Sequence, residues 1–294
     1  IHISSFTFDV LREVLSLFES LPYFAHICPL TFSCLFTLVS FLFLFFSFFF
    51  NDPAPTEIYP LSLHDALPIS VESGSARVLK EIMRKPLKLA IAERVADDCR
   101  ELGIYSNVNI LIGMPGETKK DIEDSRQFLR KLNANWKIIV VATPLVGAEM
   151  HDICVEKNYI DAADIGCDFR KAVVETEDFT AQYIQDISYD INLDVNFVHN
   201  TDFRLGEYEL ALQGFETAIR AKDNHGLAYH YASMCYEQLG DHEKALKYQK
   251  VAIEAYENDP VWKKAFDKFG LSPYTHDLER HDQVRQQPEK AFVA

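Results

Sequence analysis

The first 70 of the 294 residues contain neither glycine nor lysine, whereas all 11 glycines of the chain lie beyond them. Phenylalanine is unevenly spread as well, because 13 of its 22 copies fall within residues 1–50. The length predicts about two domains at roughly 150 residues each. Two domains of one gene seldom differ this strongly in composition, so the first 70 residues need a separate explanation.

Positive charge is also scarce, with 29 Lys and Arg against 44 Asp and Glu and a net charge of −15. This balance disfavours binding to nucleic acid through the phosphate backbone. The ten histidines form no H-x-x-x-H or H-E-x-x-H pair, so a zinc hydrolase has no support. The sequence also lacks a nucleophile elbow and a phosphate-binding loop.

The cysteines provide no disulfide framework, because the six of them are spread along the chain. Such usage is typical of a reducing compartment and predicts a cytoplasmic location. Cys99 falls on the apolar stripe of a predicted helix, which indicates a buried small side chain rather than a ligand. The six are Cys28, Cys34, Cys99, Cys154, Cys167 and Cys235.

Residues Leu30 to Phe50 form an uncharged run made mainly of Phe, Leu and Ser. A run of about 18 or more apolar residues is typical of a membrane span, so a membrane anchor is one interpretation. The run contains a single Val and no Ala, Gly or Ile, a bias that hydrophobicity alone does not require. The translation of a pyrimidine-rich DNA tract would give the same residues.

Residues 51–69, NDPAPTEIYPLSLHDALPI, resemble the translation of a common sequencing-library adapter. The end of that adapter spells Leu63 to Ile69 codon by codon. We therefore expect residues 1–70 to be an assembly artefact joined to a truncated gene, and we exclude them from the fold prediction. In the alternative interpretation, residues 30–50 anchor the protein in a membrane.

Beyond Ser70, strand and helix patterns alternate. Apolar residues recur at helical spacing from Ala92 to Leu102, and Gly103 follows as a helix stop. Thr118 with Asp121 predicts a capped helix start. The alternation predicts an α/β fold with a parallel sheet. The expected elements are strands at 108–112 and 138–142 and helices at 92–102, 118–132 and 148–157.

Three loops would follow the strands of this sheet, at residues 72–75, 113–117 and 143–149. Ligands of such folds bind at the carboxyl ends of the strands. Small residues let a ligand approach the backbone, and each following helix offers free N–H groups to polar atoms. Each loop taken singly is typical of a plain turn, so the prediction depends on the three together.

The segments VESGSARVLKEIMRK, NVNILIGMPGET and ATPLVGAEMHD resemble, in this order, the later strands of the radical S-adenosylmethionine (radical SAM) enzyme core. The resemblance covers about residues 71–160 and implies a partial (β/α) barrel made of the last strands only. It implies that Glu72 and Ser73 approach the ribose or amino-acid portion of the cofactor. The implied cofactor-binding residues are Glu72, Ser73, Gly74, Leu111, Gly113, Pro115, Gly116, Glu117, Thr143 and Pro144.

Two branches of this superfamily have similar loops. The methylthiotransferase branch ends in a small β-barrel, whereas this chain becomes helical, which favours the branch that carries a cobalamin-binding domain upstream. The family holds a 4Fe-4S cluster on a C-x-x-x-C-x-x-C loop, and no such run occurs here. The resemblance thus implies S-adenosylmethionine, the cluster and, in this branch, cobalamin for the full-length parent. We expect the chain itself to be inactive, with no catalytic or metal-binding residue and none of these cofactors bound.

From Asp190 onward the sequence repeats with a period of 34 residues, which is the period of tetratricopeptide (TPR) repeats. Gly206 recurs as Gly240, and the small Ala211 recurs as Ala245, where it would let two helices pack closely. The pattern predicts an all-α segment of two TPR-like repeats and a capping helix over residues 191–270. About three repeats are usually needed for independent stability, so we expect this segment to dock on the α/β part.

The remaining parts follow from these two. We expect a helical connector over residues 161–190, whose stripe of Phe179, Tyr183 and Ile187 carries the docking contact. Residues 271–294 are expected to be a mobile tail. The TPR-like helices would either present a concave surface to a protein or peptide partner or serve as a buttress, and the sequence leaves both open.

The preferred function is the C-terminal portion of a cytoplasmic radical SAM enzyme that acts on an unknown substrate. A rival from another class is a non-catalytic interaction module, and a third is a membrane-tethered protein. The genomic DNA upstream of Val71 would separate them. A reading frame there that encodes the three-Cys loop supports the enzyme, a start codon near residue 71 supports the module, and a continuous match through Phe50 supports the anchor.

Overall fold

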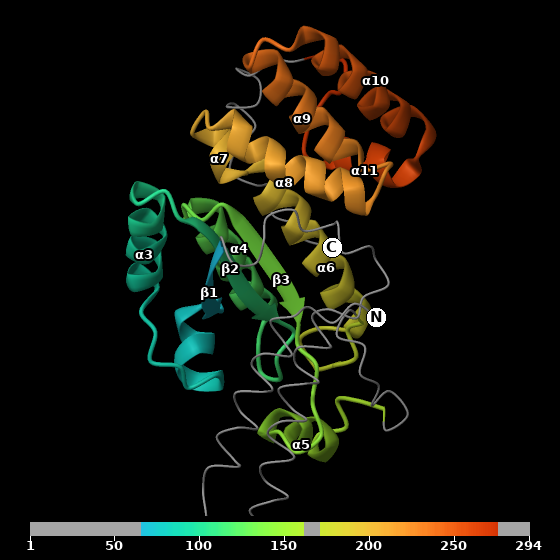
Figure 1. Cartoon of the computed structure of the whole chain (residues 1–294). Helices are drawn as coiled ribbons and strands as arrows, with labels where there is room; N and C mark the ends of the chain where they lie inside the picture. The colour runs from blue at the N-terminus through green and yellow to red at the C-terminus, as the bar shows by residue number, and fades with distance from the viewer. Residues whose placement is uncertain (1–65, 162–170, 276–294) are drawn as a thin grey trace, which may run out of the picture. The chain divides into compact units, whose positions relative to one another are not determined.

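The computed structural model describes residues 66–161 and 171–275 (Figure 1). All of them belong to the unit formed by residues 57–294. The apolar run at 30–50 and the adapter-like residues before Ala66 lie outside the described ranges, as do Cys28, Cys34 and Cys167. Within those ranges, no helix has both the length and the apolar composition needed to cross a membrane.

A three-stranded parallel sheet lies at the centre of the α/β segment, with the order β1-β2-β3. The strands are β1 (Ala66–Glu72), β2 (Tyr105–Ile112) and β3 (Trp136–Val141). The predicted parallel arrangement is confirmed. β1 begins inside the segment expected to be an artefact, so the expected boundary at residue 70 falls within a strand. Backbone pairing needs no particular side chains, and it can therefore continue across a change in composition.

The helices after β1 and β2 start and stop where local chemistry places them. α3 (Leu89–Glu101) ends just before Gly103, whose φ of 68° lets the chain turn away. α4 (Lys119–Lys131) begins with the predicted capping box, in which Thr118 and Asp121 exchange side-chain-to-backbone hydrogen bonds. α5 (Glu149–Glu156) follows β3 as predicted. A π-helical turn, η3 (Val78–Ile82), was not predicted.

One face of the sheet is buried and the other is partly open. Val108, Ile110 and Ile112 of β2 are buried in a core with Ile122 and Leu129 of α4. Burying one such side chain contributes about 1.5–3 kcal/mol. The alternate residues of β2 are only half-buried and point to the opposite face. The helices thus bury one face fully, whereas the other face is half-buried along β2.

Of the connector expected over 161–190, residues 162–170 lie outside the described ranges, and the part from 171 onward is helical only in its last section. Residues 171–180 form no helix, and α6 (Ala181–Leu193) begins after the Thr180 N-cap. Phe179, Tyr183 and Ile187 of the predicted stripe pack on the core of the sheet. A π-helical segment, η5 (Asp194–Val198), and the short α7 (Thr201–Arg204) follow α6. The first helix of the first predicted repeat is therefore broken into pieces.

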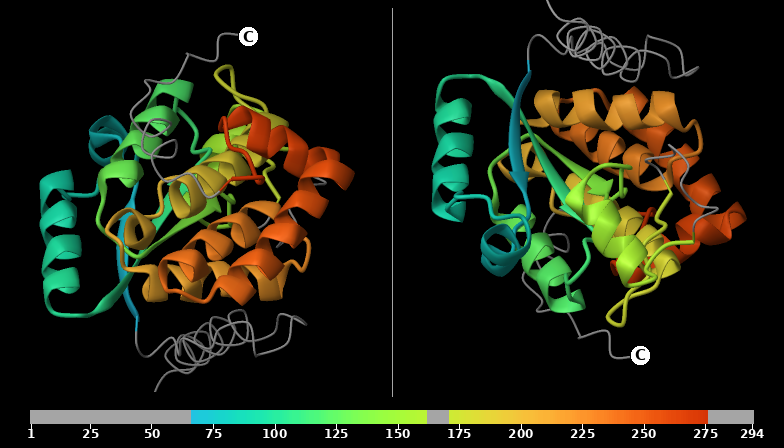
Figure 2. Two further views of the ribbon diagram at one scale, coloured as in Figure 1. Left: turned by 90° about the horizontal axis from the view of Figure 1, so that it is seen from above. Right: turned by 90° about the horizontal axis from the view of Figure 1, so that it is seen from below.

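Four further helices pack side by side (orange to red in Figure 2). They are α8 (Tyr208–Ala221), α9 (Gly226–Gln238), α10 (His242–Asn258) and α11 (Pro260–Lys268). α8 and α10 start 34 residues apart, and Gly206 and Gly240 before them both have positive φ angles, 78° and 80°. Ala211 and Ala245 are both buried. The described chain is thus a mixed α/β fold that is mostly helical.

The tail expected from residue 271 begins as ordered structure. Leu271 donates its backbone N–H to the Phe266 carbonyl and is buried in the helical core. The Pro273 carbonyl accepts a hydrogen bond from the Gln249 side chain at 3.3 Å. An apolar residue just after a Gly-terminated helix packs back on that helix, which explains the difference.

The helical segment contacts the α/β segment through polar and close-packed groups. The Asn196 side chain accepts from the Lys137 N–H at 2.9 Å and donates to the Lys137 carbonyl at 2.7 Å, so it bonds the edge of β3 as a neighbouring strand would. Asp202 accepts from Arg100 at 2.7 Å and from Asn135 at 2.9 Å. These contacts attach η5 and α7 firmly to the sheet.

Candidate functional site

The three loops that follow the strands meet at one edge of the sheet. β2 and β3 end in register, with Ile112 opposite Val141, and Glu72 at the end of β1 pairs with Ile110. The carboxyl ends of the strands therefore lie together, and the loops at 72–75, 113–117 and 143–149 follow directly from them. The sheet thus brings together the three loops that the sequence singles out.

The first loop is pinned to α4. Ser73 and Gly74 are buried, and the Ser125 hydroxyl accepts the Gly74 N–H at 3.0 Å and lies 3.3 Å from the Ser73 hydroxyl. A Cβ on Gly74 would lie 2.6 Å from the Ser125 Cα. The absent side chain thus serves packing against α4 rather than approach of a ligand.

Glu72 is the residue of this loop with an unusual backbone. Its φ of 74° lies in the left-handed region, which non-glycine residues rarely occupy. The side chain is half-buried and lies 3.4 Å from the Lys85 ammonium. Strain of this kind is often found at functional positions, so it adds to the prediction for Glu72.

Asp121 joins the first loop to the second. It accepts hydrogen bonds from the Ser75 hydroxyl at 2.7 Å, the Arg77 Nε at 3.1 Å and the Thr118 N–H at 2.9 Å. Burial opposes ionisation, but the bonds from Arg77, Thr118 and Ser75 outweigh it and hold the pKa of Asp121 well below its usual range. Arg77 also donates to the Gly116 carbonyl at 2.9 Å, so the two loops form one connected unit.

Glu117 shapes the second loop from inside. Its Oε2 accepts the N–H groups of Gly113 and Met114 at 2.6 and 3.1 Å, where the positive φ of Gly113, 87°, turns the chain. Its Oε1 is buried and has no hydrogen-bond partner. Burial raises the pKa of Glu117 to about 7, although the two N–H groups act in the opposite direction. This carboxyl group is therefore harder to ionise than an exposed glutamate.

The third loop is more exposed. Pro144 is buried and Thr143 is half-buried, with its hydroxyl 3.4 Å from the Val141 carbonyl. Glu149 forms an exposed ion pair with Arg84 at 2.7 Å, which links this loop to the segment after β1. The first two loops are thus held together by hydrogen bonds, whereas the third loop is more exposed to solvent.

The predicted cofactor-binding residues divide by accessibility. Gly116 is exposed, and Glu72, Leu111, Pro115 and Thr143 are half-buried, so a ligand can reach them. Buried positions are Ser73, Gly74, Gly113, Glu117 and Pro144. Their binding role stays a prediction, because the geometry assigns several of them to holding the loops together.

The sequence-based prediction missed two polar residues on the half-buried face of β2. Asn107 and Asn109 each have a side-chain oxygen that is buried and accepts no hydrogen bond. An unpaired buried acceptor costs about 1–3 kcal/mol. The alternation in Y-S-N-V-N-I-L-I, with asparagine at two alternate positions of one strand, is the signal that could have identified them.

The described cysteines do not fit an iron-sulfur cluster. Cys99, Cys154 and Cys235 are buried in α3, α5 and α9, and burial raises the pKa of each thiol. In residues 66–161 and 171–275, no three His, Cys, Asp or Glu side chains come together as metal ligands. The buried setting predicted for Cys99 is confirmed, and no reaction step through a cluster is assigned to these residues.

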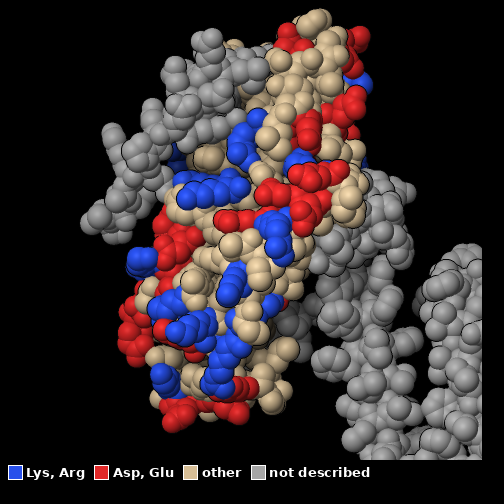
Figure 3. Space-filling model, turned by 90° about the vertical axis from the view of Figure 1, so that its left-hand side faces the viewer, with Lys and Arg blue, Asp and Glu red and all other residues tan. Residues whose placement is uncertain are grey.

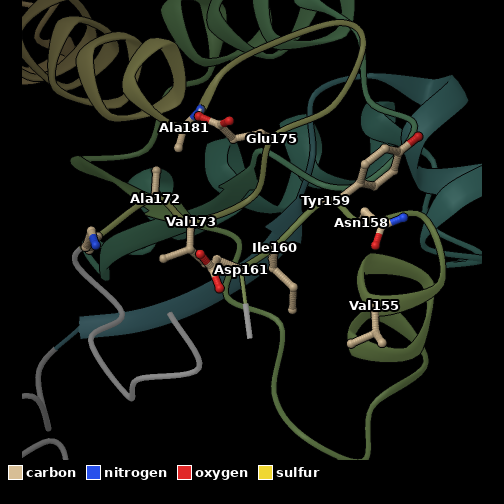
Figure 4. A pocket seen from close by; sticks show the side chains of 10 residues that line it. Val155, Asn158, Tyr159, Ile160, Asp161, Ala172, Val173, Glu175 and Ala181 are labelled. Carbon is tan, nitrogen blue, oxygen red and sulfur yellow. The ribbon is translucent and has the colours of Figure 1, made fainter. Parts of the chain in front are cut away.

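A cavity of about 690 Å³ lies elsewhere, at the end of α5 (Figure 4). It contains no residue of the three loops, and two of its lining residues, Asp161 and Lys171, flank the segment 162–170 that lies outside the described ranges. It does not form part of the candidate site. Its lining consists of Val155, Asn158, Tyr159, Ile160, Asp161, Lys171, Ala172, Val173, Glu175 and Ala181.

Charges of both signs are interspersed on the side of the molecule that carries α3 (Figure 3). Exposed ion pairs of the described residues include Lys120 with Asp124 at 2.6 Å. Surface pairs of this kind contribute little to stability. This face therefore has mixed charge, and the expectation that the protein does not bind nucleic acid stays a prediction.

No family model matches the chain. Over 98 residues it is 30% identical to a cytidylyl-2-hydroxyethylphosphonate methyltransferase of Streptomyces wedmorensis, a match that covers 31% of this chain and 18% of that protein. It is 24% identical over 90 residues to an uncharacterized methyltransferase of Pyrococcus horikoshii, covering 31% and 19%. It is 33% identical over 67 residues to a tRNA-2-methylthio-N(6)-dimethylallyladenosine synthase of Caldicellulosiruptor saccharolyticus, covering 22% and 14%.

These matches span less than a fifth of the length of each curated relative. They establish a distant similarity to two methyltransferases and a tRNA methylthio-dimethylallyladenosine synthase, over about 30% of the chain at most. A part of the chain is thus similar, at low identity, to parts of much longer proteins.

Proposed function

We propose that the α/β segment is the C-terminal part of a radical SAM enzyme core and that its three loops form one wall of the cofactor pocket. The meeting of the loops at one sheet edge, in the order that the superfamily uses, carries the proposal. The distant enzyme relatives support it. In this proposal β1 to β3 are the last strands of a (β/α) barrel, and the truncated parent belongs to the cobalamin-associated branch.

Each accessible loop residue has a role that its position allows. When bound, S-adenosylmethionine supplies an activated sulfonium group. Leu111 and Pro115 at the end of β2 offer apolar surface to the adenine, while Glu117 fixes the turn between them through the Gly113 N–H. Glu72 offers a carboxylate beside Lys85 at the end of β1. The residues of this chain thus bind and orient the cofactor, and the cluster belongs to the upstream part of the parent.

The helical segment acts in this proposal mainly as a TPR-like buttress. Gly214 of α8 packs so closely on Trp136 of β3 that a Cβ there would lie 2.5 Å from the indole ring. The bonds of Asn196 and Asp202 to the sheet support the same role. The alternative is a helix surface for a protein or peptide partner. Copurification from its own cells with and without residues 206–275 would distinguish the two.

The cofactor proposal can be tested on the full chain with S-adenosylhomocysteine, a stable analogue. We expect weak binding, seen as NMR shifts of the backbone amides of residues 111–117, and loss of those shifts in Leu111→Glu. Leu102→Glu, at an exposed position 73% accessible to solvent, is the matched control and should leave them unchanged. The absence of shifts at residues 111–117, or equal effects of both substitutions, would contradict the proposal.

A second experiment tests the assignment of the cluster. The chain as given should assemble no catalytic cluster after anaerobic reconstitution. When it is joined to its native upstream sequence, it should hold about four irons and release deoxyadenosine under strong reductant. Four irons with turnover in the present chain would refute the truncation.

A further inference from the structure

The two asparagines of β2 form a pair of hydrogen-bond acceptors without donors. Asn107 and Asn109 are alternate residues of one strand, so both side chains lie on the same face of the sheet. Each Oδ1 is buried from water and has no partner. The opposite face of the same strand is filled by Val108, Ile110 and Ile112, and its one polar residue, Ser106, has a partner because its N–H donates to the Asn135 side chain at 2.9 Å.

The surroundings of Asn109 are accessible. In the paired register, Asn109 lies between Ser70 of β1 and Ile138 of β3. Ser70 is exposed and Ile138 is 39% exposed, although both are in a sheet. Lys85 reaches the same part of β1, where its ammonium donates to the Ser70 carbonyl at 2.5 Å. Exposed neighbours and a cation thus lie beside Asn109, whereas Asn107 lies beside Trp136, which is half-buried against Gly214 of α8.

The two asparagines lie in β2 shortly before the loop at residues 113–117. Asn109 and Asn107 precede Leu111 by two and four residues along β2. Alternate residues of a strand are about 7 Å apart, a length comparable to a sugar ring with its substituents. A ligand with hydroxyl groups at both ends could therefore donate to both amides at once.

We propose that Asn107 and Asn109 bind the hydroxyl groups of a sugar or polyol substrate on the half-buried face of the sheet. This inference rests on the proposed function, because it assumes that the cofactor binds at the three loops and the substrate beside it. The amide oxygens accept from two hydroxyl groups of the substrate, and the exposed Ile138 packs against its apolar side. A substrate without such donors would leave both acceptors buried and unpaired, so the pair selects for hydroxyl groups.

The test uses the 15N-labelled full chain and two probes of matched ring size. Methyl α-D-glucopyranoside carries hydroxyl groups, whereas 2-methoxytetrahydropyran has the same ring without them. We expect saturable shifts of the Asn107 and Asn109 side-chain amide signals with the glucoside only, and binding at least tenfold weaker in Asn109→Leu. Asn224→Ala, at an exposed position in the helical segment, is the control and should bind normally.

Thermal unfolding provides a second measurement. Asn109→Leu should keep or raise the midpoint, because no hydrogen bond is lost. A fall of several degrees would show that the amide is already bonded within the chain and would overturn the inference. Equal shifts with both probes, or no saturable shift with the glucoside, would do the same. If S-adenosylhomocysteine still shifts residues 111–117 in that sample, the cofactor proposal survives without this inference.

Discussion

The sheet segment and the helical segment both use glycine in two ways. A Cβ on Gly74 of the sheet segment would lie 2.6 Å from Ser125, and one on Gly214 of the helical segment would lie 2.5 Å from Trp136, so these glycines permit close packing. Gly206 and Gly240 of the helical segment have open space around them and positive φ angles, so they serve to turn the chain. Tertiary contacts fix the first use and local backbone geometry the second.

The two segments also differ in how their buried groups are satisfied. The helical core contains stacked rings, with His225 between Phe197 at 4.6 Å and Trp262 at 4.4 Å, and burial lowers the pKa of His225 to about 3. That histidine stays neutral and contributes to packing. The sheet segment instead keeps unpaired acceptors on Glu117 and Asn109, whereas an unpaired group of the helical core is a donor, the indole N–H of Trp262. A ligand can satisfy the acceptors with a donor such as a hydroxyl group, whereas the Trp262 N–H needs an acceptor.

The largest effect is expected from a deletion that cuts into β1 rather than one that ends before it. Deleting residues 1–70 removes five of the seven residues of β1 together with their pairing to β2, and should greatly reduce folded signal. Deleting residues 1–65 leaves β1 whole and should not lower the thermal midpoint. Circular dichroism melts of both variants check this. A clear loss in the shorter deletion would show that residues 1–65 contribute to the fold.

Breaking the junction between the segments should have the next largest effect. Asp202→Ala removes the acceptor of Arg100 and Asn135 at a nearly buried position, and should cost about 3–5 kcal/mol of unfolding free energy. Asp124→Ala breaks an exposed pair with Lys120 and should cost about 0–1 kcal/mol. Urea denaturation measures both. Similar losses would mean that the junction contributes little.

The pH dependence of stability tests the same junction, because Lys137 is buried there. Burial lowers its pKa to about 7 from 10.5, and its ammonium donates to Ala134 and Thr201 rather than to a carboxylate. Between pH 7 and 10.5 the unfolded chain binds the proton and the folded chain does not, so stability rises with pH in that window and is flat below it. Lys137→Met should therefore be more stable than the parent at pH 7.

The advantage of Lys137→Met should shrink by up to about 1.4 kcal/mol per pH unit as the pH rises from 7 toward 10. Denaturation at several pH values measures the difference between the two proteins, which cancels other titrating groups. A difference that stays constant over this range would show that Lys137 remains charged in the folded protein.

The smallest effect concerns the packing of α8, α9 and α10. Ala245 is fully buried, so Ala245→Leu should cost about 1–3 kcal/mol through overpacking. Lys247→Leu on the exposed side of α10 changes no buried contact and should be nearly neutral. Thermal melts compare the two. Equal costs would contradict the 34-residue register that places a small residue at this crossing.

Much of the α/β segment could be predicted because its signals are local. The capping box of Thr118 and Asp121, the stop at Gly103 and the parallel strand order all follow from short stretches of sequence. β1 was not delimited from the sequence, and it starts at Ala66 within the residues set aside, because strand pairing uses the backbone and ignores composition. The ordered Leu271 was missed since its packing depends on the end of α11.

The meeting of the three loops could be predicted, but not the contacts within them. The loops follow from strand ends, whereas the hydrogen bonds of Ser125, Arg77 and Asp121 join residues 39 to 51 positions apart. The departure from the repeat pattern at Asp202 has a similar origin, because its carboxylate bonds the sheet segment. Hydrogen-bond partners so far apart in the sequence produce no periodic pattern from which they could be predicted.

The sequence by itself determined the elements whose causes lie within a few residues, such as periodic apolar faces, caps, glycine turns and the repeat of 34. Only the tertiary structure decided that Gly74 faces a helix whereas Gly116 faces solvent. It also decided which polar groups remain unpaired, as on Asn107 and Asn109. The physical reason is that burial and hydrogen-bond partners are properties of contacts between distant segments, whereas backbone preference is a property of neighbours.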